Sequence, residues 1–168
     1  MKDRVTAYVS LGSNLQNPLR QVTTAVEELG ALPNTTVTSR SRWYRSKAVG
    51  PGEQPDYING VAELRTGLSP EQLLDALQAI EQRHHRVRRE NWGPRTLDLD
   101  ILLYGDLQLN TDRLQIPHPH LTERNFVLYP LADLNPKLYI PKAGPIESLL
   151  ATCPRDGLIP LEPDHSSH

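Results

Sequence analysis

The sequence contains little of several features that would define its class. It has a single cysteine, Cys153, which excludes an internal disulfide and fits a reducing compartment. No apolar run approaches the roughly 18 residues needed to cross a bilayer, and no signal-peptide pattern follows Met1. The net charge of −2 lacks the basic excess typical of general nucleic-acid binding. We therefore expect a cytoplasmic protein that binds neither membranes nor nucleic acid.

The length of the chain is sufficient for one domain with its own hydrophobic core. Its 168 residues predict a single domain over residues 1–160 and a flexible tail over residues 161–168. The 15 prolines and a hydrophobic fraction of only 38% indicate that much of this domain is ordered loop.

Hydrophobic periodicity predicts four strands and two long helices. Apolar and polar residues alternate in the segments 4–12, 35–44, 56–66 and 97–103, which is typical of half-buried strands. The first helix has Asn17 as N-cap, Pro18 at its first position and Gly30 as its end. The second helix begins with a capping box, Ser69 to Gln72, and runs to about residue 84.

The resulting order is β-α-β-β-α-β followed by an irregular C-terminal third. This is the ferredoxin-like α+β fold, an antiparallel sheet with both helices on one face. Prolines dominate after residue 106, and only a short helix is predicted near residues 122–131. The face of the sheet opposite the helices is then free to carry a site.

Two aspartates in the last predicted strand are the first candidates for that site. Alternation places Leu97, Leu99, Ile101 and Leu103 on one face of the strand and Asp98 and Asp100 on the other. A D-x-D pair alone is as compatible with a solvated sheet face as with a metal site. However, residues 83–95 contain five arginines and lead directly into the pair. Carboxylates that hold Mg²⁺ beside arginines that bind phosphate are typical of sites for polyphosphate substrates.

The same open face receives Tyr57 and Asn59 from the third predicted strand. An asparagine in the middle of a strand is unfavourable unless its amide finds partners. A flat heterocycle rich in donors and acceptors would supply them, although a hydrogen bond to nearby backbone would do so as well.

Several motifs together resemble the 6-hydroxymethyl-7,8-dihydropterin pyrophosphokinase family of the folate pathway. They follow the family's order and cover most of the chain: LGSNL (11–15), GPGEQPDYIN (50–59), RVR (86–88), WGPRTLDLDILLYG (92–105) and RLQIPHPHLTERNFVLYPL (113–131). The resemblance implies the ferredoxin-like fold and transfer of pyrophosphate from ATP to the hydroxymethyl group of the pterin, which releases AMP. We expect the chain to act on these two substrates as a monomer.

The resemblance also implies a role for each matching residue. Asp98 and Asp100 would hold two Mg²⁺ ions that bridge the triphosphate, with Arg86 and Arg95 as further catalytic residues. The implied ATP-binding residues are Gln78, Glu81, Arg88, Ile101, Arg113, His118 and Arg124. The implied pterin-binding residues are Tyr57, Asn59, Trp92 and Phe126, with backbone contacts from Ser46 and Val49.

Four positions depart from the family's pattern. Asn91 stands where a basic residue is common, so one phosphate contact is either lost or supplied by Arg89. Lys47 and its neighbour Ala48 stand where prolines are common, which predicts a more flexible loop. Pro119 replaces a common aromatic, which puts the adenosine contacts at that position in doubt.

Two other functions fit parts of the sequence. A palm-like, Mg²⁺-dependent nucleotidyltransferase also places metal-binding aspartates on such a sheet, but it would release pyrophosphate instead of AMP. An RNA-binding module would carry aromatic and basic residues on its central strands, whereas the acidic pair repels phosphate unless a metal ion is bound.

Overall fold

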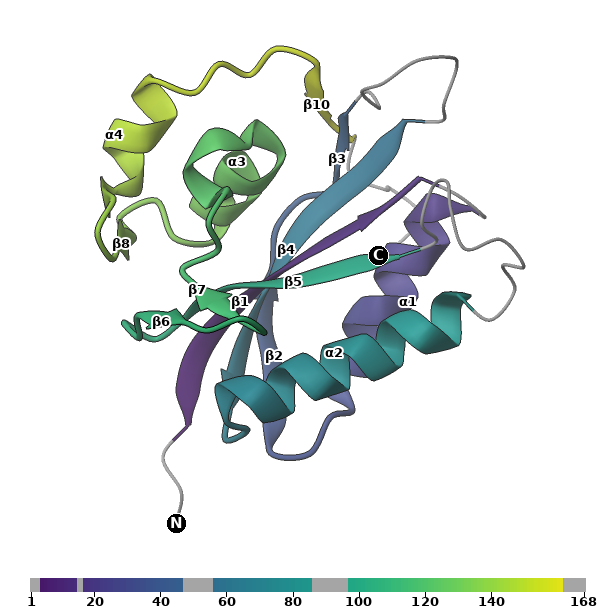
Figure 1. The fold of residues 1–168 in the computed structure, drawn as a ribbon. Coiled ribbons are helices and arrows are strands. Elements are labelled where there is room, and N and C mark those ends of the chain that lie inside the picture. The colour runs from purple at the N-terminus through teal and green to yellow at the C-terminus, as the bar shows by residue number, and fades with distance from the viewer. Residues whose placement is uncertain (1–3, 15–16, 47–55, 86–96, 162–168) are drawn as a thin grey trace.

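The computed structural model describes residues 4–14, 17–46, 56–85 and 97–161 (Figure 1). In this part of the chain the strands of the main sheet follow the order β10–β3–β4–β1–β5, and β2 pairs with β4 beside β3. Every pairing is antiparallel. The strands are β1 (Val5–Ser13), β2 (Thr35–Arg40), β3 (Tyr44–Ser46), β4 (Tyr57–Thr66), β5 (Asp98–Tyr104) and β10 (Leu158–Pro160).

Helices lie on both sides of this sheet (Figure 1). The long helices α1 (Pro18–Gly30) and α2 (Pro70–His85) cover one face. On the other side lie the short 3-10 helix η1 (Leu121–Glu123) and the helices α3 (Asn125–Leu134) and α4 (Ile146–Ala151). Two small hairpins complete the fold: β6 (Leu109–Asn110) with β7 (Gln115–Ile116), and β8 (Tyr139–Ile140) with β9 (Gly144–Pro145). No helix in the described segments is long and apolar enough to cross a membrane.

Both long helices begin where the sequence predicted. The capping box of α2 is formed, because Gln72 N donates to Ser69 Oγ at 3.1 Å and Ser69 N donates to Gln72 Oε1 at 2.9 Å. Asn17 occupies the N-cap position of α1 ahead of Pro18, but its φ of 62° is left-handed and its side chain makes no capping hydrogen bond. The predicted boundary is therefore confirmed, whereas Asn17 does not cap through its side chain.

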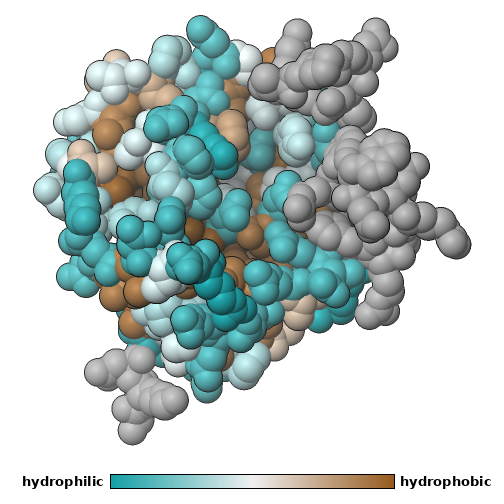
Figure 2. Space-filling model, viewed as in Figure 1, coloured by the Kyte–Doolittle hydropathy of each residue, from teal (hydrophilic) through white to brown (hydrophobic). Residues whose placement is uncertain are grey.

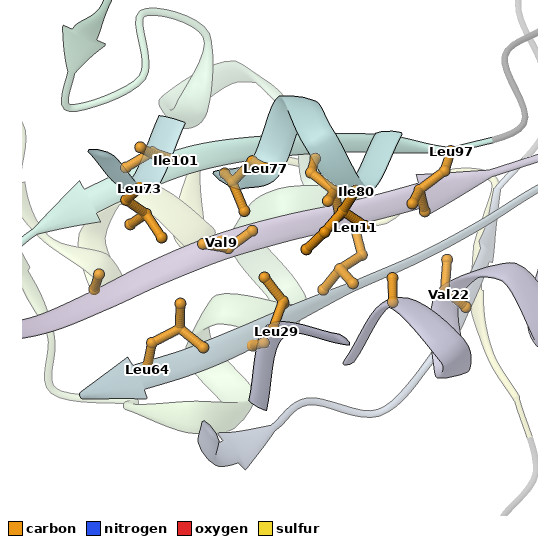
Figure 3. Close-up of a cluster of buried hydrophobic side chains, with 14 of the residues drawn as sticks. Val9, Leu11, Val22, Leu29, Leu64, Leu73, Leu77, Ile80, Leu97 and Ile101 are labelled. Carbon is orange, nitrogen blue, oxygen red and sulfur yellow. The ribbon is translucent and has the colours of Figure 1, made fainter. Parts of the chain in front are cut away.

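The main core lies between the sheet and the two long helices. Leu29 of α1 and Leu77 and Ile80 of α2 point toward Val9 and Leu11 on β1 (Figure 3). These side chains are essentially removed from water. Polar residues cover most of the described surface in the view of Figure 2, and hydrophobic residues show in smaller areas between them.

A bulge in β5 corrects part of the predicted alternation. Tyr8 pairs with Leu103 and Val9 pairs with Ile101, so Leu102 is an extra residue in β5. Beyond a bulge the side chains exchange faces. Leu103 therefore packs with Tyr8 in a second core under α3, and the prediction that it faces the long helices is wrong. The two aspartates precede the bulge and keep the predicted alternation with Leu97, Leu99 and Ile101.

The predicted strand 35–44 is two strands in the structure. β2 ends at Arg40 and β3 begins at Tyr44, and both pair with β4. Between them Ser41 pairs with the backbone groups of Val61 on β4. Val61 N donates to Ser41 Oγ, and Ser41 N donates to Val61 O, both at 2.9 Å. The interruption allows Trp43 to turn into the main core.

The C-terminal third is more regular than the sequence predicted, and it covers part of the face that was expected to be open. The predicted helix near 122–131 is η1 followed by α3, and α3 packs its buried residues Val127, Leu128 and Leu131 against β4 and β5. β10 then joins the main sheet through β3. These elements depend on contacts distant in sequence, which local periodicity does not reveal. The open part of the face is correspondingly smaller.

We predict that the hydrogen bond between Tyr44 and Asp133 stabilises the docking of α3. Tyr44 of β3 is buried, and its hydroxyl donates to Asp133 Oδ2 on α3 at 2.6 Å. Tyr44→Phe should lower the free energy of unfolding by about 1 kcal/mol at neutral pH, as measured by urea unfolding. Tyr139→Phe, on an exposed tyrosine, is the matched control.

The pH dependence of the same variant provides a second measurement. Burial and then the hydrogen bond to Asp133 raise the pKa of Tyr44. The folded protein therefore holds this proton after the unfolded chain has lost it near pH 10. The stability that Tyr44 contributes is present below pH 10 and falls as the pH rises above it. The difference between wild type and Tyr44→Phe should shrink over that range, and a constant difference would contradict the assignment.

Candidate active site

A cavity of about 600 Å³ opens on the sheet face that carries the two aspartates. One wall is the N-terminal end of α3, and the opposite wall is the sheet. A third side is formed by the turn before β10. The lining residues are Ser10, Leu11, Gly12, Ser46, Tyr57, Asn59, Asp98, Asp100, Arg124, Asn125, Phe126, Val127, Asp156 and Gly157.

The strand register explains why these side chains meet. Gly12 on β1 pairs with Asn59 on β4 and with Asp98 on β5. Ser10, two residues earlier, pairs with Asp100. Because side chains at paired positions share a face, Asp98, Gly12 and Asn59 form one row across three strands. Sequence reasoning predicted the two outer residues of this row and missed the glycine between them.

The amide of Asn59 is held by a neighbouring hydroxyl. Ser46 Oγ on β3 donates to Asn59 Oδ1 at 2.8 Å, and Asn59 is buried. In this arrangement the amide oxygen faces Ser46, and Nδ2, a donor, faces Gly12. The oxygen of the Asn59 amide therefore has a side-chain partner. It does not need the backbone partner that the sequence analysis left open.

We predict that Gly12→Ala separates binding from stability. A Cβ at Gly12 would lie 2.8 Å from Asn59 Nδ2, which is too close. Because this atom ends a side chain that can rotate, the fold should tolerate the change while the amide moves. The KM for the ligand recognised by Asn59 should rise about tenfold, with a change in unfolding free energy below about 1 kcal/mol.

The control for Gly12→Ala is Gly30→Ala, where the added Cβ meets only Val37 Cγ2 at 3.7 Å. Gly30→Ala should change neither quantity. A Gly12→Ala protein that unfolds at much lower urea concentration, or that keeps the wild-type KM, would contradict the proposed role of Gly12.

The two aspartates differ in exposure and are anchored through the residue between them. Asp98 is half-buried and Asp100 is exposed. Leu99 N, between them, donates to Glu81 Oε2 of α2 at 2.8 Å. Glu81 thus satisfies a backbone group at the edge of β5 and holds the strand that presents both carboxylates. In this structure Glu81 acts on the site through the β5 backbone.

A second, smaller cavity of about 240 Å³ adjoins the first at Asp100. Three of the residues that the family resemblance assigned to ATP line it: Ile101, Arg113 and His118. Pro119, one of the departures from the family's pattern, lines it too. Asp100 is the residue common to the two cavities.

Strand β5 positions the backbone of His118. The backbone N–H of His118 donates to Leu102 O of β5 at 3.0 Å. Burial lowers the pKa of His118, Asp100 acts to raise it, and Arg124 and His120 lower it further. The ring is therefore neutral near pH 7. His120 N donates to His118 Nδ1 at 3.1 Å, so the proton of the neutral ring is on Nε2, which is then a donor.

Arg113 and Gln78 connect this cavity to α2. Arg113 pairs with Asp75 and lies 3.5 Å from Gln78 Oε1. Gln78 itself lines a shallow depression along α2 with Asp75, Ala79, Gln82 and Arg83. On the other side of Asp100, the Arg124 guanidinium lies 5.7 Å from the centre of the Phe126 ring, at the rim of the first cavity.

Five predicted site residues lie outside the described part of the chain: Arg86, Arg88, Arg95, Trp92 and Val49. The departures at Lys47, Ala48 and Asn91 lie outside it as well. Conversely, sequence reasoning missed Ser10, Gly12, Asn125, Asp156 and Gly157. The LGSNL motif was a signal for Gly12, and the motif over residues 113–131 contains Asn125, whereas nothing in the local sequence indicated Asp156 and Gly157.

Most of the chain is similar to enzymes of one kind. A family model described as 7,8-dihydro-6-hydroxymethylpterin-pyrophosphokinase matches residues 8–136. The chain is 52% identical over 151 residues to the 2-amino-4-hydroxy-6-hydroxymethyldihydropteridine pyrophosphokinase of Pseudomonas aeruginosa, covering 90% of this chain and 93% of that relative. It is 45% identical over 159 residues to the enzyme of the same name from Haemophilus influenzae, covering 95% and 99%.

The fold is similar to that of part of a longer protein. A crystal structure of Plasmodium falciparum HPPK-DHPS superimposes with a TM-score of 0.69 over 89% of this chain, at 13% identity. This chain spans less than half of that longer one, 45% of its length. At such low identity the similarity concerns the α+β fold alone.

Proposed function

Because the chain belongs to the 7,8-dihydro-6-hydroxymethylpterin pyrophosphokinase family, we propose that the two cavities that meet at Asp100 hold its two substrates. The enzyme transfers pyrophosphate from ATP to the hydroxymethyl group of 6-hydroxymethyl-7,8-dihydropterin and gives AMP and the pterin diphosphate. The reaction is a step of folate biosynthesis.

The shared position of Asp100 is the observation that carries this assignment. The larger cavity contains Tyr57, Asn59 and Phe126, which suit a flat heterocycle. The smaller one contains Arg113 and the Nε2 donor of His118, which suit a nucleotide. Pyrophosphoryl transfer requires the hydroxyl of one substrate to reach the phosphorus of the other, and positioning supplies much of the rate. Asp100 lies at the boundary between the two cavities, where the two substrates would meet.

The pterin would lie in the larger cavity with its ring recognised by the Asn59 amide. The Ser46 hydroxyl holds that amide in place, and the amide then offers its NH2 group and the remaining lone pair of its oxygen. Tyr57 and Phe126 line the same cavity, and each aromatic contact with the ring contributes about 0.5–1.5 kcal/mol beyond area burial. Ser46 acts here through its hydroxyl, in addition to the backbone contact implied by the resemblance.

The nucleotide would lie in the smaller cavity, with its triphosphate directed toward Asp100. Arg113 at the rim supplies a fixed positive charge and a planar set of donors for phosphate. Ile101 supplies an apolar surface from β5, and His118 donates a hydrogen bond from Nε2. Arg124, beside Phe126, closes the boundary on the pterin side. Arg86, Arg88 and Arg95 remain part of the proposal as further phosphate contacts.

Asp98 and Asp100 fit a bound Mg²⁺. Their hard oxygen ligands project from one face of β5, and Asp100 is exposed. Among the described residues no group of three metal-binding side chains converges. Mg²⁺ usually keeps several waters and binds through one or two carboxylates together with substrate phosphate. We propose two such ions, which would neutralise the triphosphate and favour ionisation of the attacking hydroxyl.

Identification of the products tests this function against the alternative nucleotidyltransferase. Incubation with ATP, Mg²⁺ and 6-hydroxymethyl-7,8-dihydropterin should yield AMP in a pterin-dependent manner, together with the pterin diphosphate. Release of pyrophosphate, or no pterin-dependent AMP from folded protein, would reject the proposal. High-resolution chromatography of the nucleotides distinguishes the three outcomes.

The strand order, the domain bounds and the state of the protein in the cell complete the proposal. We infer that the strand order is the ferredoxin-like one, since β5, β1 and β4 and the pair β2/β3 stand in the order expected for it. We also propose one domain over residues 1–160, because the main sheet joins the first strand of the chain to the last described one. The protein would act as a cytoplasmic monomer, and its mass in solution would test the oligomeric state.

A further inference from the structure

Arg113, which the proposed function places against the nucleotide, has a carboxylate partner within the protein itself. Its Nη2 forms an ion pair with Asp75 Oδ1 of α2 and lies 3.5 Å from Gln78 Oε1. Figure 1 shows the hairpin of β6 and β7, which carries Arg113, beside the first half of α2. Asp75 and Gln78 line the depression along α2, whereas Arg113 lines the smaller cavity. One end of the Arg113 guanidinium is therefore turned toward α2.

The backbone around Arg113 is fixed, so the side chain is the part that can change its partner. Thr111 N donates to Leu114 O at 2.9 Å, and Leu114 N donates to Thr111 Oγ at 3.0 Å. These bonds close the turn that contains Arg113, and Leu114 is anchored in the main core. The side chains of Arg113 and Asp75 are 45% and 64% exposed. Water and dissolved anions therefore reach the ion pair and can compete for either partner.

A phosphate would compete with Asp75 for the same donors. A carboxylate and a phosphate both bind an arginine through its planar set of N–H groups. The hydrogen bond with Asp75 raises the pKa of Arg113, loss of hydration lowers it, and the charges of Asp75 and Glu71 raise it further. Acidic side chains of α2 thus already compensate the positive charge of Arg113. A triphosphate must either displace the Asp75 carboxylate or bind beside its negative charge, and both weaken nucleotide binding.

We propose that Asp75 is an affinity-determining residue that competes with the nucleotide for Arg113. This inference rests on the proposed function of the smaller cavity. Asp75 lines neither that cavity nor the larger one, and it is not among the residues that the family resemblance implies. It would set how tightly ATP binds without touching the reacting atoms. The opposite reading, that Asp75 holds Arg113 ready for phosphate, predicts a change of affinity in the opposite direction.

The Asp75→Asn variant tests the proposal, since it keeps the shape of the side chain and removes its charge. The Kd of a non-hydrolysable ATP analogue, measured by calorimetry in the presence of Mg²⁺, should fall about threefold, within the range for loss of an exposed ion pair. An unchanged or raised Kd would overturn the proposal. A raised Kd would show that Asp75 holds Arg113 in place for the nucleotide.

Glu71→Gln is the matched control. It removes one negative charge from the same helix, one turn before Asp75, and its charge also acts on Arg113. In the described part of the chain, however, Glu71 forms no ion pair with Arg113. The Kd of the ATP analogue should change less than twofold in this variant. A decrease as large as that of Asp75→Asn would overturn the proposal, because the effect would then be one of general charge and not of competition for Arg113.

A double-mutant cycle shows whether Asp75 acts through Arg113. In an Arg113→Gln background, Asp75→Asn should no longer tighten binding of the ATP analogue, because the carboxylate has no guanidinium to occupy. Equal tightening with and without Arg113 would overturn the proposal. A wild-type protein that binds no ATP analogue would reject the proposed function and this inference with it. Binding that is unchanged by Asp75→Asn would reject this inference alone.

Discussion

Asp100→Asn is expected to reduce pterin-dependent formation of AMP by at least about 1,000-fold, comparable to the loss of a main electrostatic contact to a transition state. The residue is shared by the two cavities and presents an exposed carboxylate between them. Asparagine keeps the shape of the side chain and loses the charge that, in the proposed function, would hold Mg²⁺. The rate of AMP formation with saturating substrates measures the effect.

Stability and the matched variant Asp106→Asn serve as controls for Asp100→Asn. Because Asp100 is exposed, the free energy of unfolding should change by less than about 0.5 kcal/mol. Asp106→Asn should keep the wild-type rate, as Asp106 lies outside both cavities. A rate within tenfold of wild type for a folded Asp100→Asn protein would contradict the assignment of this carboxylate to the metal.

Gly60→Ala should lower the free energy of unfolding by about 3 kcal/mol, at the upper end of the usual cost of overpacking. Gly60 lies on β4 in the middle of the sheet. An added Cβ would lie 2.5 Å from Cε3 and 2.6 Å from Cζ3 of Trp43. The Trp43 ring is buried and has the Arg40 guanidinium 4.7 Å from its centre, so it has little room to move. Urea unfolding followed by circular dichroism gives the difference.

A double-mutant cycle shows whether the tryptophan ring causes that loss. In a Trp43→Leu background, which removes most of the ring, Gly60→Ala should cost less than about 1 kcal/mol. Gly30→Ala, whose added Cβ meets one side chain at ordinary distance, should be nearly neutral in either background. If Gly60→Ala were equally destabilising with and without the ring, the cost would reflect the strand backbone and not the contact with Trp43.

Much of the fold followed from local patterns in the sequence. The capping box at Ser69 and Pro18 at the first position of the first helix placed both helix starts, since these signals act within one turn. The period of two placed four segments in strands. It did not reveal the bulge at Leu102, because the extra residue is defined only by its pairing with β1. Nor did it reveal α3 on the second face, whose contacts are distant in sequence.

The candidate site was predictable to the extent that it depends on alternation within a strand. Asp98, Asp100 and Asn59 all project from the face expected for them, and the register of β1 brings the two strands together. The contribution of Gly12 follows from what it lacks, a Cβ that would displace the Asn59 amide. Asp156 is held at the cavity by two hydrogen bonds that Asn125 donates to the backbone of Pro154 and Asp156. These acceptors lie 29 and 31 positions farther along the chain than Asn125. No pattern within a strand or helix encodes such a contact.

The boundary at Asp100 also has a kinetic consequence. In the proposed function the two cavities that share Asp100 hold the two substrates, and the pyrophosphoryl group then has only a short distance to travel from donor to acceptor. It can pass directly, without first being attached to a side chain of the enzyme. Both substrates must then be present at the same time, as in a ternary-complex mechanism. In double-reciprocal plots at several fixed concentrations of the second substrate, such an enzyme gives lines that intersect, whereas a relay through a phosphorylated enzyme gives parallel ones.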